Sequence, residues 1–252
     1  MLKVDNLHAW YGKSHVLHGV NFDVRPGEIV ALLGRNGSGR STTAKAIMGL
    51  VDCQGSIDWK GQAIQGKKAY EVAHLGIGYV PENRDIFPKL SVFENLRCAV
   101  LWSLGYKYTF FKFLSGLKDA NDRTNELLEM IHLDKKRDVL AVNLTYAEQR
   151  ALEIGVTIAG GSDVILLDEP TAGMSKSETS RFIQLIKEVT VGKTLLTVEH
   201  DMGVVFGLAD KIAVVVYGEV IAFDTPDAVR ANAKVQEAYL GSPVADSQAG
   251  GH

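Results

Sequence analysis

The chain has 252 residues, of which 46% are hydrophobic and 23% are charged, which is the balance of an ordinary globular protein. This length suits one large α/β domain or two small ones and is ample for a sizeable core. Its 27 lysine and arginine residues nearly cancel its 30 acidic residues, and the formal net charge of -3 gives no electrostatic reason to expect nucleic-acid binding.

Cysteines and apolar runs indicate the compartment. The two cysteines of the sequence, Cys53 and Cys98, do not form a CxxC pair, and charged residues within the first five positions interrupt any signal peptide. Both observations favour a reducing cytosol. The longest apolar runs, such as 164–167 and 212–216, are too short to span a bilayer and predict buried strands. We therefore expect a chain that does not cross a membrane by itself.

The first part of the chain predicts short strands that lead to a glycine-rich turn. The strand-like runs are 2–4, 16–24 and 29–33, with turns at 11–13 and 25–27. The run 29–33 is apolar on both faces, as expected of a central parallel strand. It stops at Gly34, and a helix-compatible stretch runs from about Arg40 to Leu50. A strand, a glycine-rich turn and a helix form the context that a phosphate-binding loop requires.

The rest of the chain predicts a parallel sheet with helices inserted into it. Residues 55–80 have the pattern of further short strands, and residues 92 to about 158 are mainly helical. A further helix is expected at 176–190. Strand signals return at 164–167, 194–198 and 212–216. This alternation of strands and helices predicts an α/β fold.

The same pattern predicts the domain organisation. We expect a single domain over 1–241, with a helical subdomain inserted at about 84–158. Residues 242–252 are small and polar and predict a flexible tail.

Residues 34–42 have the pattern of a phosphate-binding loop. Glycines let consecutive backbone N–H groups converge on phosphate oxygens, and the helix that begins at Arg40 adds the positive end of its dipole. Ser41 stands where a hydroxyl would ligate Mg²⁺. An ordinary glycine-rich turn is the alternative interpretation. The candidate nucleotide-binding residues of the loop are Gly34, Arg35, Asn36, Gly37, Ser38, Gly39, Arg40, Ser41 and Thr42.

The loop departs from the pattern GxxxxGK[ST] at one position, where Arg40 replaces the lysine. Lysine is a compact point charge, whereas a guanidinium group is larger, planar and differently directed. Because Arg40 keeps the positive charge, we expect phosphate binding to survive. The geometry of the transition state is where the substitution is expected to matter.

Two acidic residues end the apolar run 164–167. At the carboxyl end of a strand, Asp168 can hold Mg²⁺ through its water shell, and Glu169 can polarise the water that attacks a γ-phosphate. The alternative is a buried strand followed by an acidic surface turn. The phosphate loop lies upstream in the correct order, which favours the catalytic interpretation.

With further motifs in the correct order, the chain resembles the ATPase subunits of ABC transporters over almost its whole length, the tail excepted. This resemblance implies a RecA-like P-loop core, an antiparallel β subdomain and an inserted helical subdomain, with ATP and Mg²⁺ as ligands. Tyr11 stands where the family stacks an aromatic ring on adenine. Glu82, in Tyr79-Val80-Pro81-Glu82, stands at the Q-loop position. Residues 171–175 match the D-loop, and His200 matches the switch histidine.

In the family, a signature motif, LSGGQ, contacts the γ-phosphate of the nucleotide that is bound to the opposite subunit. In this chain the motif is Leu144-Thr145-Tyr146-Ala147-Glu148. Thr145 preserves a hydroxyl donor. Ala147 replaces a glycine, and its methyl group could hinder a close backbone approach or a positive φ angle. Glu148 places a carboxylate near a polyanion, and repulsion is expected unless the side chain points away.

More narrowly, the chain is similar to the importer ATPases for branched-chain amino acids. The stretches HAWYGKSHVLHGV, VPENRDIFPKLSVFENL and EHDMGVVFGLADKI carry this likeness, as does the ending VQEAYLG. One of the two ATPase subunits of that system also has glutamate at the Q-loop position, so Glu82 need not be a defect. Urea, aromatic-acid and lipopolysaccharide systems use closely similar ATPases.

Each single residue has a simpler alternative. Tyr11 is an adenine platform or a turn tyrosine, and His200 is a γ-phosphate sensor or a structural histidine. Glu82 contacts a metal-bound or attacking water, or is a solvated loop acid.

An aromatic-rich stretch lies in the predicted helical insertion. It is either a surface for the permease, which the family docks on this subdomain, or internal packing, and both remain open. Lys107 and Lys112 argue against bilayer insertion. The aromatic residues are Trp102, Tyr106, Tyr108, Phe110, Phe111 and Phe113.

The resemblance implies a dimeric motor at the inner face of the cell membrane. Two ATPase subunits, identical or different, would close head to tail over ATP and push on permease subunits, which a solute-binding protein supplies. In the cytoplasmic, peripheral subunit Glu169 would be the general base. One rival is a regulatory subunit with weak or no turnover, motivated by Arg40, Ala147 and Glu148. The other is an ATPase acting on DNA or ribosomes, which the single cassette without heptads disfavours.

Overall fold

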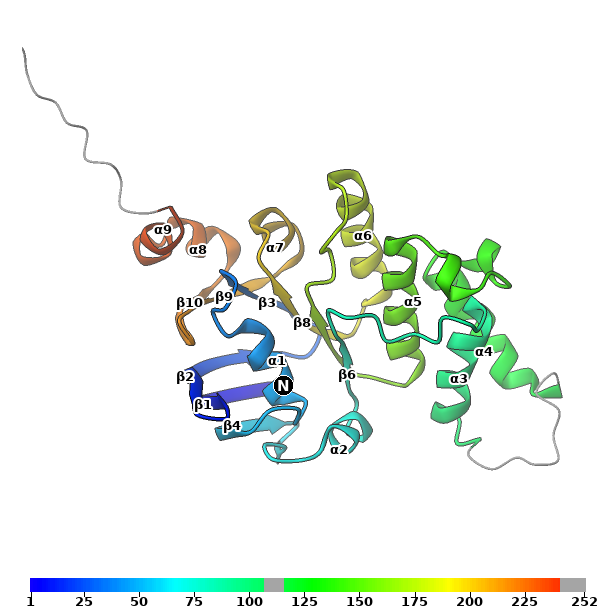
Figure 1. Cartoon of the computed structure of the whole chain (residues 1–252), viewed down its shortest axis with the longest axis horizontal. Coiled ribbons are helices and arrows are strands. Elements are labelled where there is room, and N and C mark those ends of the chain that lie inside the picture. Colours follow the sequence, from blue (N-terminus) through cyan, green and yellow to red (C-terminus); the bar gives the residue numbers. More distant parts are fainter. Residues whose placement is uncertain (107–115, 241–252) are drawn as a thin grey trace, which may run out of the picture.

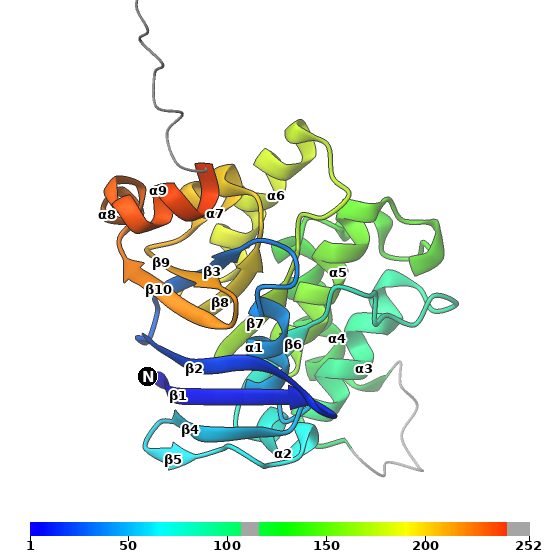
Figure 2. The ribbon, with the colours of Figure 1, turned by 60° about the vertical axis from the view of Figure 1, so that its left-hand side comes forward.

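Two sheets face each other across one helix. The structure, a computed structural model, describes residues 1–106 and 116–240. Within these residues one sheet has the strand order β2-β1-β4-β5, and the other has the order β10-β9-β3-β8-β7-β6. Figures 1 and 2 show the helix α1 (Arg40–Ile47) between the two sheets. This is the α/β arrangement that the sequence predicts.

The smaller sheet is antiparallel. Its strands are β1 (Leu2–Tyr11), β2 (Ser14–Val24), β4 (Cys53–Trp59) and β5 (Gln62–Ala63). The predicted first strand, 2–4, is wrong in length. Asn6 has a φ angle of 47°, and the pairing register between β1 and β2 shifts between Val4 and Leu7. This irregularity interrupts the alternation of apolar residues, so a search for period two loses the strand.

The larger sheet brings the carboxyl ends of its parallel strands to one edge. Those strands are β3 (Ile29–Gly34), β6 (Ile77–Val80), β7 (Val164–Asp168), β8 (Thr194–Glu199) and β9 (Lys211–Val216), and β10 (Glu219–Asp224) pairs antiparallel with β9. The phosphate loop follows β3 at this edge, and the acidic pair lies at the end of β7, where open α/β sheets bind ligands.

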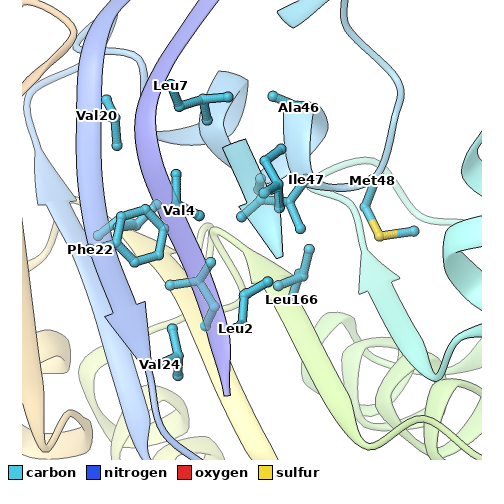
Figure 3. Close-up of a cluster of buried hydrophobic side chains, with 14 of the residues drawn as sticks. Leu2, Val4, Leu7, Val20, Phe22, Val24, Ala46, Ile47, Met48 and Leu166 are labelled. Carbon is cyan, nitrogen blue, oxygen red and sulfur yellow. The ribbon is translucent and has the colours of Figure 1, made fainter. Parts of the chain in front are cut away.

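The core holds α1 from both sides. Figure 3 shows Ile47 of α1 beside Leu166 of β7 and Leu2 and Val4 of β1. Ile47, Leu166 and Leu2 are fully buried, and burying such a side chain contributes about 1.5–3 kcal/mol. The helix that begins at the phosphate loop is therefore fixed on a rigid base.

The chain between β6 and β7 is mainly helical, as predicted. Helices α3 (Val92–Ser103), α4 (Lys118–Met130) and α5 (Tyr146–Ala159) pack on one another at one end of the molecule (Figure 1), with 3₁₀ turns η2 (Asp134–Lys136) and η3 (Ala141–Asn143) before α5. Their buried side chains share a second core cluster with Ile165 and Leu167, on the other face of the sheet. The domain boundaries at 84–158 and 241 stay predictions.

Helix α6 (Lys176–Val189) lies where the sequence predicts it, but four short helices were missed. They are α2 (Ala69–His74), α7 (Met202–Leu208), α8 (Pro226–Ala231) and α9 (Ala233–Leu240). Each has eight residues or fewer, so its apolar face is too short for a periodic signal. The strand β10 was missed as well.

Two predictions fall outside the described residues. They concern the tail 242–252 and, in the aromatic-rich stretch, Lys107, Tyr108, Phe110, Phe111, Lys112 and Phe113. Of the described aromatic residues, Trp102 has its ring centroid 5.6 Å from that of His74. Across residues 1–106 and 116–240, no helix combines the length and the apolar character that a membrane crossing needs.

Candidate functional site

The loop between β3 and α1 is closed by main-chain hydrogen bonds. The Ser38 amide donates to the Arg35 carbonyl at 3.0 Å, and the Ser38 carbonyl accepts from the Gly218 amide at 2.9 Å. A Cβ atom on Gly34 would collide with Ser38 Oγ, and Gly39 has a φ angle of 104°, so both positions require glycine. Ser38 Oγ is buried and has no hydrogen-bond partner among the described residues. A phosphate oxygen would supply one.

Arg40 turns its side chain back into this loop. The side chain is 5% exposed, and Nη2 donates to Asn36 Oδ1 at 3.3 Å and to Glu169 Oε1 at 3.2 Å. Nη1 is buried without a hydrogen-bond partner in the described part of the chain. The planar guanidinium group can therefore hold Glu169 with one nitrogen and offer the other to an anion.

Ser41 and Asp168 provide oxygen atoms that suit a magnesium ion. Ser41 Oγ donates to Asp168 Oδ1 at 2.7 Å, and Asp168 is 2% exposed. Mg²⁺ binds through one or two carboxylates together with substrate phosphates rather than in an all-protein cage. Residues 1–106 and 116–240 contain no cluster of three or more His, Cys, Asp or Glu side chains that could hold a metal ion. The donors fit an ion that is shared with a nucleotide.

Glu169 lies between Arg40 and His200. Its φ angle is 46°, a strained value for a residue with a side chain, and its amide donates to the Val198 carbonyl at 2.9 Å. Glu169 Oε2 is 3.5 Å from Nδ1 of His200, whose side chain is half exposed. The carboxylate is fixed between a cation and an open histidine, and it is placed to accept a proton from a water molecule.

Glu82 lies in the loop after β6. It lines a pocket of about 280 Å³ together with Tyr79, Lys45 and Asp168. The structure thus brings Glu82 and Asp168, which are far apart in the sequence, to the same pocket.

Two buried residues that the sequence analysis missed hold this loop. Arg150 is fully buried and donates to the carbonyls of Pro81 and Glu82, and to Glu153 Oε2 at 2.9 Å. Glu153 Oε1 accepts the Asp85 amide at 2.7 Å, and burial raises the pKa of Glu153. Helix α5 therefore fixes the backbone at Glu82. An oppositely charged pair three positions apart on an apolar helix was the signal that could have found them.

The signature motif begins α5, and the Glu148 carboxylate is hydrogen-bonded within its own chain. Glu148 Oε2 accepts the Thr145 amide at 3.0 Å, and Glu148 Oε1 accepts Lys136 Nζ at 2.6 Å. Burial disfavours the charged carboxylate, but the hydrogen bonds from Lys136 and Thr145 outweigh it and lower the pKa of Glu148. The carboxylate therefore caps its own helix, while its repulsion of a nucleotide on the partner subunit stays a prediction.

Ala147 lies in the first turn of α5 and is not among the described residues with positive φ. The backbone therefore needs no positive φ angle at this position, and the hindrance of a close backbone approach by the methyl group stays a prediction. Next to it, the Tyr146 ring lies 4.3 Å from the Arg84 guanidinium carbon.

We expect Glu148→Ala to lower the free energy of unfolding at pH 7 by about 1 kcal/mol, or the thermal midpoint by roughly 2–4 °C, because it removes the cap and the Lys136 contact. Since the folded pKa is lowered from 4.5, this contribution is present above pH 4.5 and is lost as the pH falls through the folded pKa. Thermal unfolding at pH 7 and at pH 3 measures both.

A matched control is Glu178→Ala, which removes the capping box of α6 formed with Ser175. None of the described salt bridges joins Glu178 to a lysine, so its effect should be smaller. Equal midpoints for Glu148→Ala and the wild type at pH 7 would contradict the capping role.

Tyr11 ends β1 and is 48% exposed. It lines a pocket of about 300 Å³ with Gly49 and Leu50, which follow α1. The ring is thus free to take a flat ligand, and adenine stacking on it stays a prediction.

The site as a whole has the arrangement of a P-loop ATPase, in which a glycine-rich loop faces an aspartate and a glutamate at the end of a neighbouring strand. A family model described as ABC transporter matches residues 17–172, and one described as Branched-chain amino acid ATP-binding cassette transporter matches residues 219–245. The chain belongs to the ABC transporter family and is one of its ATP-hydrolysing subunits.

Relatives match almost the whole chain. The high-affinity branched-chain amino acid transport ATP-binding protein LivG of Escherichia coli (strain K12) is 33% identical over 249 residues, which cover 96% of this chain and 98% of that protein. BraG of Pseudomonas aeruginosa, which bears the same description, is 31% identical over 244 residues, with 96% and 100% covered.

Solved structures confirm the predicted ABC ATPase fold. The ADP conformation of MJ1267, an ATP-binding cassette of an ABC transporter, is 26% identical with a TM-score of 0.82, covering 96% of this chain and 98% of that chain. A dimeric post-hydrolysis state of the ATP-binding cassette MJ0796, bound to ADP and Pi, is 25% identical with a TM-score of 0.74, covering 90% and 99%.

Proposed function

We propose that the chain binds Mg²⁺-ATP at this site and hydrolyses it to drive import of branched-chain amino acids. The observation that carries the proposal is the contact of Arg40 with Glu169 beside the contact of Ser41 with Asp168. Together these two contacts bring four side chains to one edge of the sheet, which supports their proposed roles as a phosphate-binding cation, a base and donors for a metal ion.

Each group of site residues has its own chemical role in binding the nucleotide and the metal ion. The amides of residues 36–39 and the free Nη1 of Arg40 bind the phosphates, with Thr42 behind them in the first turn of α1. Ser41 and Asp168 hold the metal ion, which when bound neutralises charge on the phosphates. Glu82 lines the same pocket as Asp168 and orients a water molecule there.

Hydrolysis needs a base and a group that responds to the γ-phosphate. Glu169 accepts the proton of the attacking water, because it is ordered by Arg40 and only partly exposed. His200 lies on the open side of Glu169 and contacts the γ-phosphate. Tyr11 stacks on the adenine ring.

A second ATPase subunit completes each site. The solved relative MJ0796 is a dimer. In this chain Thr145 is exposed, and the first-turn amides of α5 at Tyr146 and Ala147 lie at a helix N-terminus, which favours an anion. We infer that these groups contact the nucleotide held by the opposite subunit.

The partners follow from the transport class. LivG and BraG are described as branched-chain amino acid transport proteins, and this chain has their length. The helical stretch exposes Phe87, Trp102 and Leu104 by 46–60%, and such apolar exposure suits a docked permease at the inner face of the cell membrane. A solute-binding protein would deliver the amino acid to that permease.

A reconstituted transporter tests this proposal. The tagged chain, purified from detergent-solubilised membranes, should recover two permeases and an ATPase partner. In vesicles with the solute-binding protein, this complex should accumulate labelled leucine only with ATP, and a complex carrying Glu169→Gln should not. Recovery of ribosomes or DNA instead of permeases would contradict it.

The alternative of a regulatory subunit with weak or no turnover is not supported. The relatives LivG and BraG, which the chain matches over 98% and 100% of their length, are described as transport ATP-binding proteins. Two of the departures that motivated it, Ala147 and Glu148, are accommodated within the helix of their own subunit.

A further inference from the structure

We propose that Tyr79 is a positioning residue for the metal ligand Asp168 and thereby sets the affinity of the nucleotide-bound site for Mg²⁺. This inference rests on the proposed function of the site. In this proposal Tyr79 acts through the carboxylate of Asp168 and is not itself a ligand of the metal.

Both oxygens of Asp168 have a donor. The Tyr79 hydroxyl donates to Oδ2 at 3.0 Å, while Ser41 Oγ donates to Oδ1 at 2.7 Å. The carboxylate is therefore held at two points, one from the helix α1 and one from the strand β6. Because the Ser41 hydroxyl donates its hydrogen to Asp168, the lone pairs of the Ser41 oxygen remain available to a metal ion.

The sheet register explains how Tyr79 reaches this position. Strands β6 and β7 are parallel neighbours, and Tyr79 pairs with Leu166. Leu166 and Asp168 share one face of the sheet, and they are separated by about 6.6 Å along the strand. A tyrosine ring is long enough to cover that distance, so the hydroxyl of Tyr79 ends beside the carboxylate. Phenylalanine would fill the same space without reaching Asp168 with a donor.

The hydroxyl remains a donor at ordinary pH. A phenolic hydroxyl carries its proton at neutral pH and can donate it to a carboxylate. A protonated hydroxyl stabilises the carboxylate of Asp168 in the orientation that accepts its hydrogen bond, whereas a phenolate would repel the carboxylate. Partners of this kind orient metal ligands, and losing one typically costs about 10–100-fold in metal affinity.

The placement also links two parts of the site. Tyr79 lies three residues before Glu82, and both residues line the pocket that contains Asp168. The hydroxyl of Tyr79 thus adds a side-chain link to the metal ligand beside the backbone pairing of β6 with β7. We infer that Tyr79 keeps Asp168 and the Glu82 loop in register around the ion.

The test is Tyr79→Phe, measured by calorimetry with the ATP analogue AMP-PNP, once with Mg²⁺ and once with EDTA. Affinity in EDTA should stay within about twofold of the wild type, which also reports intact folding. The gain in affinity that Mg²⁺ produces should fall about tenfold. The Mg²⁺ concentration for half-maximal ATPase should rise by a similar factor, with turnover restored at high Mg²⁺.

Tyr106→Phe is the matched control, because it removes another tyrosine–aspartate hydrogen bond, to Asp119 at 2.7 Å, away from the phosphate loop. It should leave the affinity for AMP-PNP unchanged, both with Mg²⁺ and with EDTA. The inference is overturned if Tyr79→Phe keeps the full gain from Mg²⁺, or if it weakens binding equally in EDTA. A wild-type chain that binds no AMP-PNP under either condition would instead overturn the proposed function, and this inference with it.

Discussion

Glu169→Gln is expected to lower steady-state ATP hydrolysis by at least about 100-fold while ATP affinity changes by less than about threefold. Glutamine keeps the size of the side chain and an oxygen that can accept from Arg40, which lies 3.2 Å from Glu169 in the wild type. It has no carboxylate to accept the proton of the attacking water. Phosphate release by the assembled transporter at saturating ATP, together with calorimetry, measures both quantities.

Glu188→Gln provides the control for this variant. Glu188 is an exposed carboxylate 3.4 Å from His132, so the substitution makes the same change of charge away from the phosphate loop. Its hydrolysis rate should equal that of the wild type. If Glu169→Gln retains wild-type hydrolysis, Glu169 is not the general base.

Arg40→Ala is expected to weaken ATP binding by roughly 10- to 100-fold, because hydrogen bonds between charged groups contribute about 1.5–3 kcal/mol each. It removes the buried Nη1, which has no partner among the described residues, and it releases Glu169. ATP titration by calorimetry measures the loss. Arg40→Met fills most of the vacated space without the charge, and it should show the same loss if the charge is responsible.

Arg40→Lys separates charge from shape. Lysine keeps the positive charge and is the phosphate-binding residue of the GxxxxGK[ST] pattern, so we expect ATP affinity and turnover within about threefold of the wild type. A sharp rise in turnover would show that arginine impairs hydrolysis and would revive the regulatory alternative. An affinity as low as that of Arg40→Ala would show that the guanidinium fork, rather than the charge, binds the phosphates.

The phosphate loop and the acidic pair could be predicted because their chemistry is local. Gly34 and Gly39 are required by backbone geometry inside one short loop, and Asp168 and Glu169 directly follow one apolar strand. The order of elements then predicts that both reach the same sheet edge. The contact between Ser41 and Asp168 agrees with that expectation.

Other features depend on contacts between distant residues. The sequence suggests repulsion at Glu148, because nothing nearby in the chain predicts that Lys136 approaches it. The charged pair of Arg150 and Glu153 is visible in the sequence, but nothing there predicts that the loop at Pro81 folds over Arg150. Tyr79 likewise has no role until the parallel pairing of β6 with β7 places it beside Asp168.

The central claim is that residues 34–42 enclose the phosphates of ATP opposite Asp168 and Glu169. Calorimetric titration of the wild-type chain with ATP and Mg²⁺ tests it most directly. The account predicts saturable binding with a dissociation constant between about 1 μM and 1 mM. No detectable binding, even in the presence of the permease and partner ATPase subunits, would contradict it.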